Sequence, residues 1–406
     1  MTDIQKENKS GGKVPNNPKQ IPNLRFPEFE GEWEVKKLGE IATFSKGKGI
    51  SKSEIEENGI TECIRYGELY THYREVINEI KSRTNVDKSA LVLSEENDVI
   101  IPASGETTID IATASCVLKP GIALGGDLNI IKSKNDGVFL SYYLNSKKKM
   151  EIANLAQGIS VVHLYSSQLA SLSLSLPTNQ EQEKISTFLA KISERIDCSI
   201  KIINDLKTLK IATAKKIFSG ELRFKDDNGN DFPEWEVREV GEVFKITRGN
   251  VLAMNLVSNQ CNEKNTYPVY SSQTKNNGLA GYYTDFLFED AITWTTDGAN
   301  AGDVNYRSGK FYCTNVCGVL ISNEGYANSC IAELINSVSK NYVSYVGNPK
   351  LMNGVMSEIK IPFPSLPEQT KIANFLSAID SKIDMENQLL QKLEEQKKYL
   401  LQNMFV

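Results

Sequence analysis

Small clusters of basic and amide side chains, each next to glycine or serine, recur at loop-like positions along this sequence. Arginine, asparagine and glutamine can form paired hydrogen bonds with the edges of DNA bases, and lysine, serine and threonine suit phosphate groups. On this chemistry we select ten candidate DNA-contacting residues: Lys46, Lys48, Arg65, Tyr66, Arg248, Asn250, Gln273, Asn276, Asn277 and Asn300. Clusters of this composition also form ordinary turns, so the chemistry alone leaves both interpretations open.

Motifs typical of catalytic sites are missing from the sequence. It has no Gly-x-x-x-x-Gly-Lys-Ser/Thr loop for nucleotide phosphates and no Asn/Asp-Pro-Pro-Tyr/Phe tetrapeptide of an amino-methyltransferase. Its two histidines, His72 and His163, have no neighbouring metal ligands. Cys313 and Cys317 are predicted to share one face of a single β-like run as small buried residues. We therefore expect no catalytic residue, no metal site and no cofactor bound by this chain.

Composition limits the class of protein. A chain of 406 residues predicts two to three domains, and no apolar stretch is long enough to predict a transmembrane helix. The seven cysteines are scattered, which favours reduced thiols in a cytoplasm over a disulfide framework. The net charge of −5 does not indicate a nucleic-acid binder, but it says nothing about where the charges lie.

Two motifs occur twice, in the same order. Residues 33–47 recur at 235–249 with an offset of 202, each copy beginning with Trp-Glu-Val. Residues 181–197 recur at 368–384 with an offset of 187, and nine of the seventeen positions are identical. The chain is therefore a tandem duplication with similar ends and divergent middles.

Each copy of the second motif begins a long segment with apolar residues at helical spacings. A helix of about 38 residues, roughly 57 Å long, cannot bury a narrow apolar seam by itself. We predict that the two helices pair, with each helix packing only on its own domain as the alternative. The predicted interface residues are Ile185, Leu189, Ile192, Ile196, Ile203, Leu206, Ile372, Leu376, Ile379, Ile383, Leu390 and Leu393.

The divergent middles predict an α+β fold. Short β-rich runs lie at 92–102, 112–119, 286–296, 302–306 and 311–321, and helical patterns lie at 140–156 and 329–339. The predicted organisation is a disordered tail (1–20), a first globular domain (21–176), a first long helix (177–220), a linker with a second globular domain (221–363) and a second long helix (364–406).

The whole pattern from about residue 21 to 406 resembles the specificity subunit of a Type I restriction-modification system. The resemblance is carried by Pro27-Glu28-Phe29 through Trp33 to Ile41 with its repeat at Phe232–Trp235, and by the two helix starts. These helix starts are Pro177 with Glu181-Gln182-x-Lys184-Ile185-x-x-Phe188-Leu189, and Pro364 with Pro367-Glu368-Gln369-x-Lys371-Ile372-x-x-Phe375-Leu376.

The resemblance implies a division of labour among subunits. The two globular domains would be target-recognition domains, each reading one half of a bipartite, asymmetric sequence in double-stranded DNA. The two helices would pack antiparallel as a ruler that fixes the spacer, and would dock two modification (methyltransferase) subunits. Those partners would use S-adenosylmethionine to methylate adenine, and restriction subunits would use ATP and Mg²⁺ to cleave DNA. This chain would supply recognition alone.

Two other classes of function stay open on the residues themselves. One is a coiled-coil scaffold whose paired domains bind a partner other than DNA. The other is a nuclease or methyltransferase with an unrecognised site.

Overall fold

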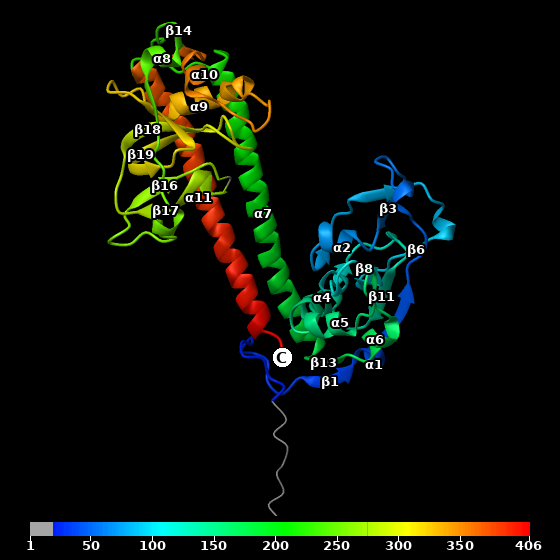
Figure 1. Cartoon of the computed structure of the whole chain (residues 1–406). Helices are drawn as coiled ribbons and strands as arrows, with labels where there is room; N and C mark the ends of the chain where they lie inside the picture. The colour runs from blue at the N-terminus through cyan, green and yellow to red at the C-terminus, as the bar shows by residue number, and fades with distance from the viewer. Residues whose placement is uncertain (1–18, 274) are drawn as a thin grey trace, which may run out of the picture. The chain divides into compact units, whose positions relative to one another are not determined.

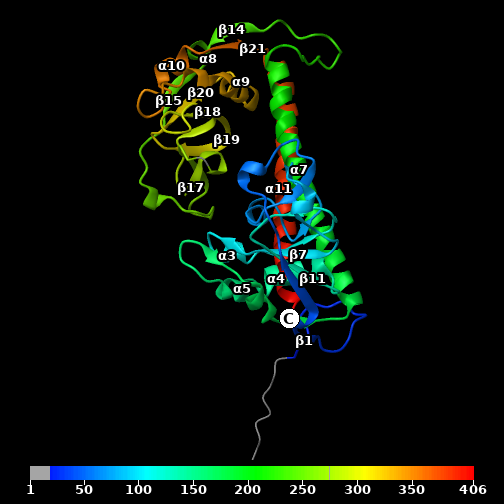
Figure 2. The ribbon, with the colours of Figure 1, turned by 90° about the vertical axis from the view of Figure 1, so that its right-hand side faces the viewer.

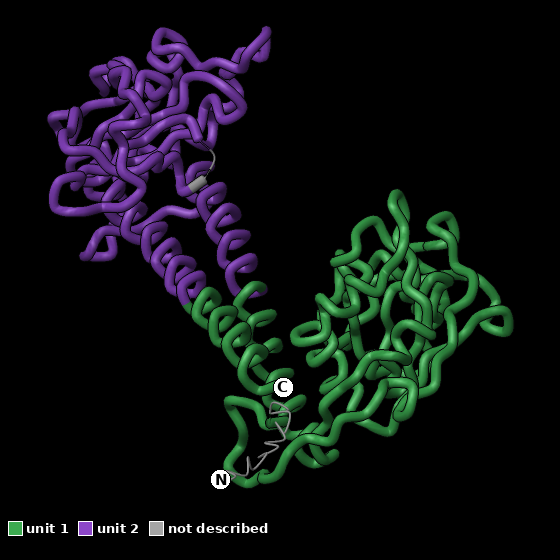
Figure 3. The backbone as a smooth tube through the Cα atoms, turned by 60° about the horizontal axis from the view of Figure 1, so that its bottom comes forward, with its two compact units in different colours: residues 1–200, 389–406 green, residues 201–388 purple. Residues whose placement is uncertain are grey.

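The structure is a computed structural model that describes residues 19–273 and 275–406 and divides the chain into two compact units. Unit 1 comprises the chain up to Ile200 together with Leu389–Val406, and unit 2 comprises Lys201–Gln388 (Figure 3). The tail predicted over residues 1–20 lies, up to residue 18, outside the described residues.

Both long helices expected from the second repeated motif are present. The first, α7, spans Asn179–Phe218, and the second, α11, spans Leu366–Asn403 (Figure 1). α7 ends just before Gly220, whose φ of +76° is a conformation that favours glycine. Each helix passes from one unit into the other, so each unit contains a part of both helices (Figure 3).

The first globular domain is built on a five-stranded sheet in unit 1. Its strand order is β2-β11-β7-β9-β4, and only the edge pair β4–β9 is parallel. These strands are β2 (Ala42–Lys46), β4 (Val76–Ile77), β7 (Asp98–Pro102), β9 (Ser115–Val117) and β11 (Leu128–Ser133). A second sheet has the order β5-β3-β10-β6, formed by β3 (Thr61–Ile64), β5 (Ser82–Thr84), β6 (Val92–Leu93) and β10 (Ala123–Leu124).

Short helices and one small strand pair complete this domain. The helices are α1 (Leu38–Ile41), α2 (Glu68–Thr71), α3 (Thr108–Ile111), α4 (Gly137–Ser146), α5 (Lys149–Leu155) and α6 (Ser166–Ala170), with 3₁₀ turns at Lys52–Glu54 and Lys88–Ala90. The small pair joins β8 (Ser104–Gly105) to β12 (Val162–His163). Helix α4 packs against β7 and β9 and thereby covers one face of the five-stranded sheet.

The second globular domain, in unit 2, has a six-stranded sheet. Its order is β15-β20-β18-β19-β16-β17, and only the pair β16–β19 is parallel. The strands are β15 (Lys245–Arg248), β16 (Tyr267–Tyr270), β17 (Leu279–Tyr283), β18 (Phe288–Thr295), β19 (Val304–Cys313) and β20 (Cys317–Ile321). The first five strands of this order match the five-stranded sheet of unit 1 one for one. The divergent middles therefore share one sheet topology.

Helices of the second domain lie against this sheet and at its ends. They are α8 (Val240–Val243), α9 (Ser329–Ser339) and α10 (Asn353–Ser357), with 3₁₀ turns at Met254–Leu256, Lys275–Gly278 and Lys340–Tyr342. Helix α9 packs against β19 (Figure 2). The helical patterns read from the sequence at 140–156 and 329–339 correspond to α4 with α5 and to α9.

Several strand boundaries differ from the prediction. The run predicted over 92–102 forms two strands in different sheets, β6 and β7. The sequence indicated a break between 306 and 311, but β19 runs through this segment because Gly309, with φ +67°, forms a bulge opposite Asp290. The break lies at 314–316 instead, so the prediction that Cys313 and Cys317 share a single run is wrong: Cys313 ends β19 and Cys317 begins β20. Both thiols are buried, and burial raises the pKa of Cys317 to about 11.

The first repeated motif forms a small sheet with the residues that precede each long helix. In unit 1, β1 (Glu34–Lys37) pairs antiparallel with β13 (Ser173–Leu176). In unit 2, β14 (Glu236–Glu239) pairs in the same way with β21 (Lys360–Phe363) (Figure 2). Each Trp-Glu-Val motif is therefore fixed next to the start of the following long helix.

A buried glutamate at the start of α7 holds this arrangement in unit 1. The Glu181 carboxylate accepts hydrogen bonds from Arg25 Nε and Nη2, both at 2.7 Å, and from Trp33 Nε1 at 3.3 Å. Its side chain is only 1% exposed. The neighbouring Gln182 donates from Nε2 to Asn135 Oδ1 at 3.0 Å. The Glu-Gln pair thus joins the helix start to two other parts of the domain.

The start of α11 repeats these contacts in unit 2. The fully buried Glu368 accepts hydrogen bonds from Arg223 Nε and Nη2 at 2.8 and 3.0 Å and from Trp235 Nε1 at 2.7 Å. Gln369 accepts from Asn328 Nδ2 at 2.8 Å. Because each motif supplies one side of this contact, the structure explains why the two motifs occur as a pair in each half.

The seam predicted for the helix pair is packed in unit 1. The first part of α7 meets the last part of α11 in one apolar cluster. Ile185, Leu189, Ile192 and Ile196 are buried there with Leu400, Met404 and Phe405, and Leu390 and Leu393 are half-buried against them. Burial of each of these isoleucine and leucine side chains contributes about 1.5–3 kcal/mol to the stability of the folded state.

Unit 2 contains the complementary contact between the end of α7 and the start of α11. Ile217 packs with Ile372 and Leu376, while Ile203, Ile379 and Ile383 are buried and Leu206 is half-buried. Opposite ends of the two helices meet in each unit, so the helices run antiparallel. The alternative that each helix packs only on its own domain is wrong.

Candidate nucleic-acid interface

The candidate lysines of the first domain lie on an exposed turn after β2. Lys46 ends that strand and Lys48 follows Gly47, and both lysines are exposed. A Cβ at Gly47 would lie 1.9 Å from the carbonyl oxygen of Gly125, so only glycine fits this close approach. Neither lysine forms an ion pair with any residue that the structure describes. Their charges are therefore available to a ligand.

Arg65 and Tyr66 follow β3 and come close to the same turn. The Gly125 N–H donates to the Ile64 carbonyl at 2.9 Å, and the Lys48 N–H donates to the Leu124 carbonyl at 3.0 Å. Both candidate loops of the first domain thus share residues 124–125 as a neighbour.

The Arg65 side chain is less available than the two lysines. Its Nη2 lies 3.6 Å from Oε1 of the buried Glu68, and the Arg65 backbone N–H donates to Oε2 of Glu68 at 2.9 Å. Its Nε atom is buried without a hydrogen-bond partner among the described residues. Tyr66 is half-buried against an apolar cluster to which both sheets of the domain contribute, for example Ile64 of β3 and Ile100 of β7. Arg65 and Tyr66 are therefore held in place largely by the domain itself.

Arg248 and Asn250 occupy the matching place after β15 in the second domain. Here a Cβ at Gly249 would lie 2.2 Å from the Cys313 carbonyl oxygen, and the Asn250 N–H donates to that oxygen at 3.1 Å. The half-buried Arg248 donates from Nε to Asn353 Oδ1 at 3.3 Å, while Asn250 is exposed. The repeat at offset 202 therefore places a cation at the same position in both domains.

The remaining candidates gather around the loop after β16. Asn276 and Asn277 are exposed and have φ values of +51° and +50°, a conformation that asparagine tolerates better than most residues. The Gln273 side chain donates to the Leu279 carbonyl. Asn300 donates from Nδ2 to the Ser272 carbonyl at 3.2 Å, so the structure brings these four amides into one region of the second domain.

Comparison with known proteins adds the decisive observation. A family model described as the Type I restriction modification DNA specificity domain matches residues 30–208 and again residues 233–395. The two matches together span more than half of the chain, one in each half. The chain belongs to the family of Type I restriction-modification specificity subunits.

Individual relatives agree with this assignment. A Mycoplasma pneumoniae protein assigned as a type I specificity subunit is 32% identical over 238 residues, which cover 57% of this chain and 91% of that relative. The MjaVIII specificity subunit of Methanocaldococcus jannaschii is 24% identical over 430 residues, covering 94% and 93% of the two chains. The crystal structure of a Type I S subunit from M. genitalium has the same fold, with a TM-score of 0.69, 19% identity and coverage of 95% and 99%.

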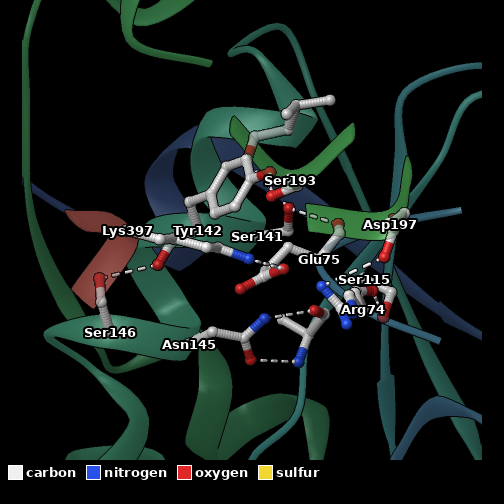
Figure 4. Close-up of polar contacts among 12 residues, drawn as sticks. Arg74, Glu75, Ser115, Ser141, Tyr142, Asn145, Ser146, Ser193, Asp197 and Lys397 are labelled. Atoms are coloured by element: carbon white, nitrogen blue, oxygen red, sulfur yellow. Dashed lines mark hydrogen bonds and ion pairs between the residues drawn. The ribbon is translucent and has the colours of Figure 1, made fainter. Parts of the chain in front are cut away.

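In this specificity subunit, one lysine in each unit connects the helix pair to the adjacent recognition domain. Lys397 on α11 forms an ion pair with Glu75 at 2.9 Å, with side chains only 12% and 15% exposed, and lies 5.4 Å from the Tyr142 ring (Figure 4). The Tyr142 hydroxyl and Ser193 Oγ of α7 are hydrogen-bonded at 2.8 Å (Figure 4).

The matching lysine in unit 2 is Lys210, displaced from Lys397 by the repeat offset of 187. It reaches Glu333 of α9 at 2.6 Å and Asp380 of α11 at 2.9 Å. Both recognition domains are thus attached to helices by a buried or half-buried lysine as well as by the helix-start glutamate.

Two groups of residues in the specificity subunit were missed by the sequence reasoning. The arginines that bind the helix-start glutamates belong to a third repeat, Leu-Arg-Phe at 24–26 and 222–224, whose offset of 198 differs from both others. The other is Arg307, which lies in the segment read as a break between strands and carries no local motif. The Leu-Arg-Phe repeat was detectable in principle, whereas Arg307 was not.

No helix in the part of the chain that the structure describes is both long and apolar enough to cross a membrane. Within the same residues, no group of three or more His, Cys, Asp or Glu side chains is arranged to hold a metal ion.

Proposed function

We propose that this specificity subunit reads a bipartite, asymmetric sequence in double-stranded DNA, one half with each recognition domain. The observation that carries the proposal is the contrast within the chain. The two units share the strand order, the glutamate–arginine–tryptophan contact and the helix pairing, whereas the candidate recognition loops differ: Lys46, Lys48, Arg65 and Tyr66 in one domain, and mainly amides in the other. Such a chain presents two different sets of recognition loops on two scaffolds of the same architecture.

In this proposal the antiparallel helices set the non-specific spacer and dock two methyltransferase subunits. Those partners bind S-adenosylmethionine and methylate an adenine in each half-site, which requires the base to leave the stack. Restriction subunits, with ATP and Mg²⁺, join to cleave unmodified DNA. The chain itself is non-catalytic, binds no cofactor and works in the cytoplasm. Its acidic net charge is tolerable because the partners contribute phosphate contacts.

The test is reconstitution from purified components. The full chain, the cognate methyltransferase subunit and their mixture are each incubated with DNA and labelled S-adenosylmethionine, and separately with Mg²⁺. The proposal predicts methyl transfer to adenine only in the mixture, and only in DNA that contains one bipartite motif.

Other outcomes point to the rival functions. Methyl transfer or cleavage by the chain alone would indicate an enzyme with an unrecognised site. A mixture that is assembled and folded but methylates no preferred sequence would favour the coiled-coil scaffold with a partner other than DNA.

A further inference from the structure

Arg307, on β19, is a buried cation at the edge of a polar hollow in the second recognition domain. Its side chain is 8% exposed, and its guanidinium carbon lies 3.7 Å from the centre of the Tyr270 ring. Nε donates to Thr293 Oγ1 at 3.0 Å, and Nη2 donates to the Asn277 carbonyl at 2.7 Å. These partners fix the position of the guanidinium but are all uncharged.

No carboxylate in the described ranges, 19–273 and 275–406, forms an ion pair with Arg307, although the chain has 51 acidic residues. Arginine stays protonated in proteins, and a buried charge is costly unless it is paired. Loss of hydration on burial lowers the pKa of Arg307 from its usual range, because burial destabilises the charged form of the guanidinium. The domain therefore holds a cation that lacks a counter-ion.

The hollow beside Arg307 has a volume of about 240 Å³ and is lined mainly by hydroxyl and amide side chains, among them Gln273, Thr295, Asn305 and Asn336. Its one carboxylate, Asp303, is already neutralised by Lys340 at 2.9 Å. The walls thus offer neutral hydrogen-bonding groups around one unpaired positive charge. This combination suits a small oxyanion, which accepts several hydrogen bonds and carries the missing charge.

We propose that this hollow binds one oxyanion of the phosphate class through Arg307, and that this phosphate belongs to the backbone of the DNA read by the second recognition domain. The part that concerns DNA rests on the proposed function. The anion site itself does not depend on it.

The position of the hollow favours DNA as the source of the phosphate. Asn277, whose carbonyl accepts from Arg307, and Gln273, which lines the hollow, both belong to the candidate recognition loop. A phosphate held there would fix the register of that loop on the duplex without reading a base.

Two variants and one control test the site. Arg307→Gln removes the positive charge. Asn305→Asp is nearly isosteric and supplies an internal counter-ion, because residue 305 lies on the same face of β19 as Arg307, two residues away. The second variant keeps the test valid if Arg307→Gln fails to fold. Lys310→Gln, on the same strand but exposed, changes the net charge equally without touching the hollow. The chain is assembled with its methyltransferase subunits. The affinity of this complex for DNA that contains the sequence it methylates is then measured at a series of salt concentrations.

We expect Arg307→Gln and Asn305→Asp to weaken binding roughly ten-fold and to reduce the steepness of the log–log salt dependence by about 0.9, with the methylated sequence unchanged. Lys310→Gln should change affinity less than about two-fold. Unchanged DNA affinity in both Arg307→Gln and Asn305→Asp, or an equal loss in the control, would overturn the assignment of the phosphate to DNA. Relaxed preference at one base pair would also overturn it, because Arg307 would then read a base edge.

A second measurement separates the anion site from the DNA function. The full chain alone is titrated with inorganic phosphate, with sodium chloride at matched ionic strength, and its thermal unfolding is followed. Stabilisation of the wild-type chain that is lost in Asn305→Asp supports the anion site, and equal responses in both contradict it. If the wild-type chain binds phosphate but the variants do not change the affinity of the complex for DNA, the hollow is a site for free phosphate. A wild-type complex that methylates no motif would contradict the proposed function instead.

Discussion

At the scale of single residues, the buried carboxylates at the helix starts are the groups on which each half depends. Glu181 and Glu368 have almost no access to water. The negative charge of each is balanced by an ion pair with one arginine and stabilised by a hydrogen bond from one tryptophan. A buried carboxylate that loses its cation keeps the cost of desolvation without the compensating attraction. Single substitutions at the arginines should therefore have effects far larger than those at exposed ion pairs.

We predict that Arg223→Met lowers the free energy of unfolding by about 3 kcal/mol, because it leaves the Glu368 carboxylate buried with only neutral donors. The matched control is Arg238→Met, which breaks an ion pair with Glu236 whose side chains are 41% and 70% exposed. This control should cost less than about 1 kcal/mol. Urea unfolding of the full chain measures both, and equal losses would show that the buried contact has no special role.

At the scale of elements, the long helices could be predicted from the sequence, the bounds of the strands only in part, and the pairing of the small sheets not at all. The repeats and the 3.6-residue period determine α7 and α11 well, because a single apolar face must be buried along their whole length. The pairing of β1 with β13 could not be predicted, since residues 34–37 and 173–176 lie far apart in sequence and each strand has only four residues.

The candidate site also combines features that the local sequence predicts with contacts that only the structure shows. Local chemistry identified loops that the structure brings together, such as Gln273, Asn277 and Asn300. Arg65 and Glu68 are only three residues apart, so their contact is local and was detectable in principle. The contact of Arg307 with the Asn277 carbonyl was not detectable, because it depends on how strands far apart in sequence are ordered in the sheet.

We predict that Ile192→Glu destabilises the chain by about 3 kcal/mol, because the side chain is 8% exposed in the seam where α7 meets α11 in unit 1. The control is Ile211→Glu on the same helix, where the side chain is 72% exposed and the change should stay within about 0.5 kcal/mol. Thermal and urea unfolding report both effects. A tolerated glutamate at position 192 would contradict the buried seam.

At the scale of the whole molecule, the chain consists of two units with the same organisation, and two continuous helices run through both of them. Each unit combines a recognition domain, a helix-start glutamate and a packed part of the helix pair, and α7 and α11 both contribute residues to each unit. If the helices set the spacer, their length and the spacing between the half-sites must change together.

We predict that inserting seven residues into α7 after Ile200 and seven into α11 after Gln388 lengthens the spacer by about three base pairs. Seven helical residues add about 10.5 Å, and one base pair of B-DNA occupies about 3.4 Å. A seven-residue insertion also keeps the apolar seam in phase. The methylated motif should keep both half-sites, and an insertion in one helix alone should abolish assembly. A lengthened pair that retains the original spacer would contradict the ruler.

On the proposed function, this chain supplies the sequence preference of an adenine methyltransferase. The most direct measurement is a genome-wide map of N6-methyladenine in cells that express the cognate methyltransferase subunit, with and without this chain. We predict that deletion of the chain removes methylation from one bipartite motif, and that the same map reveals both half-sites and the spacer. An unchanged methylation map, with the methyltransferase shown to be expressed, would contradict it.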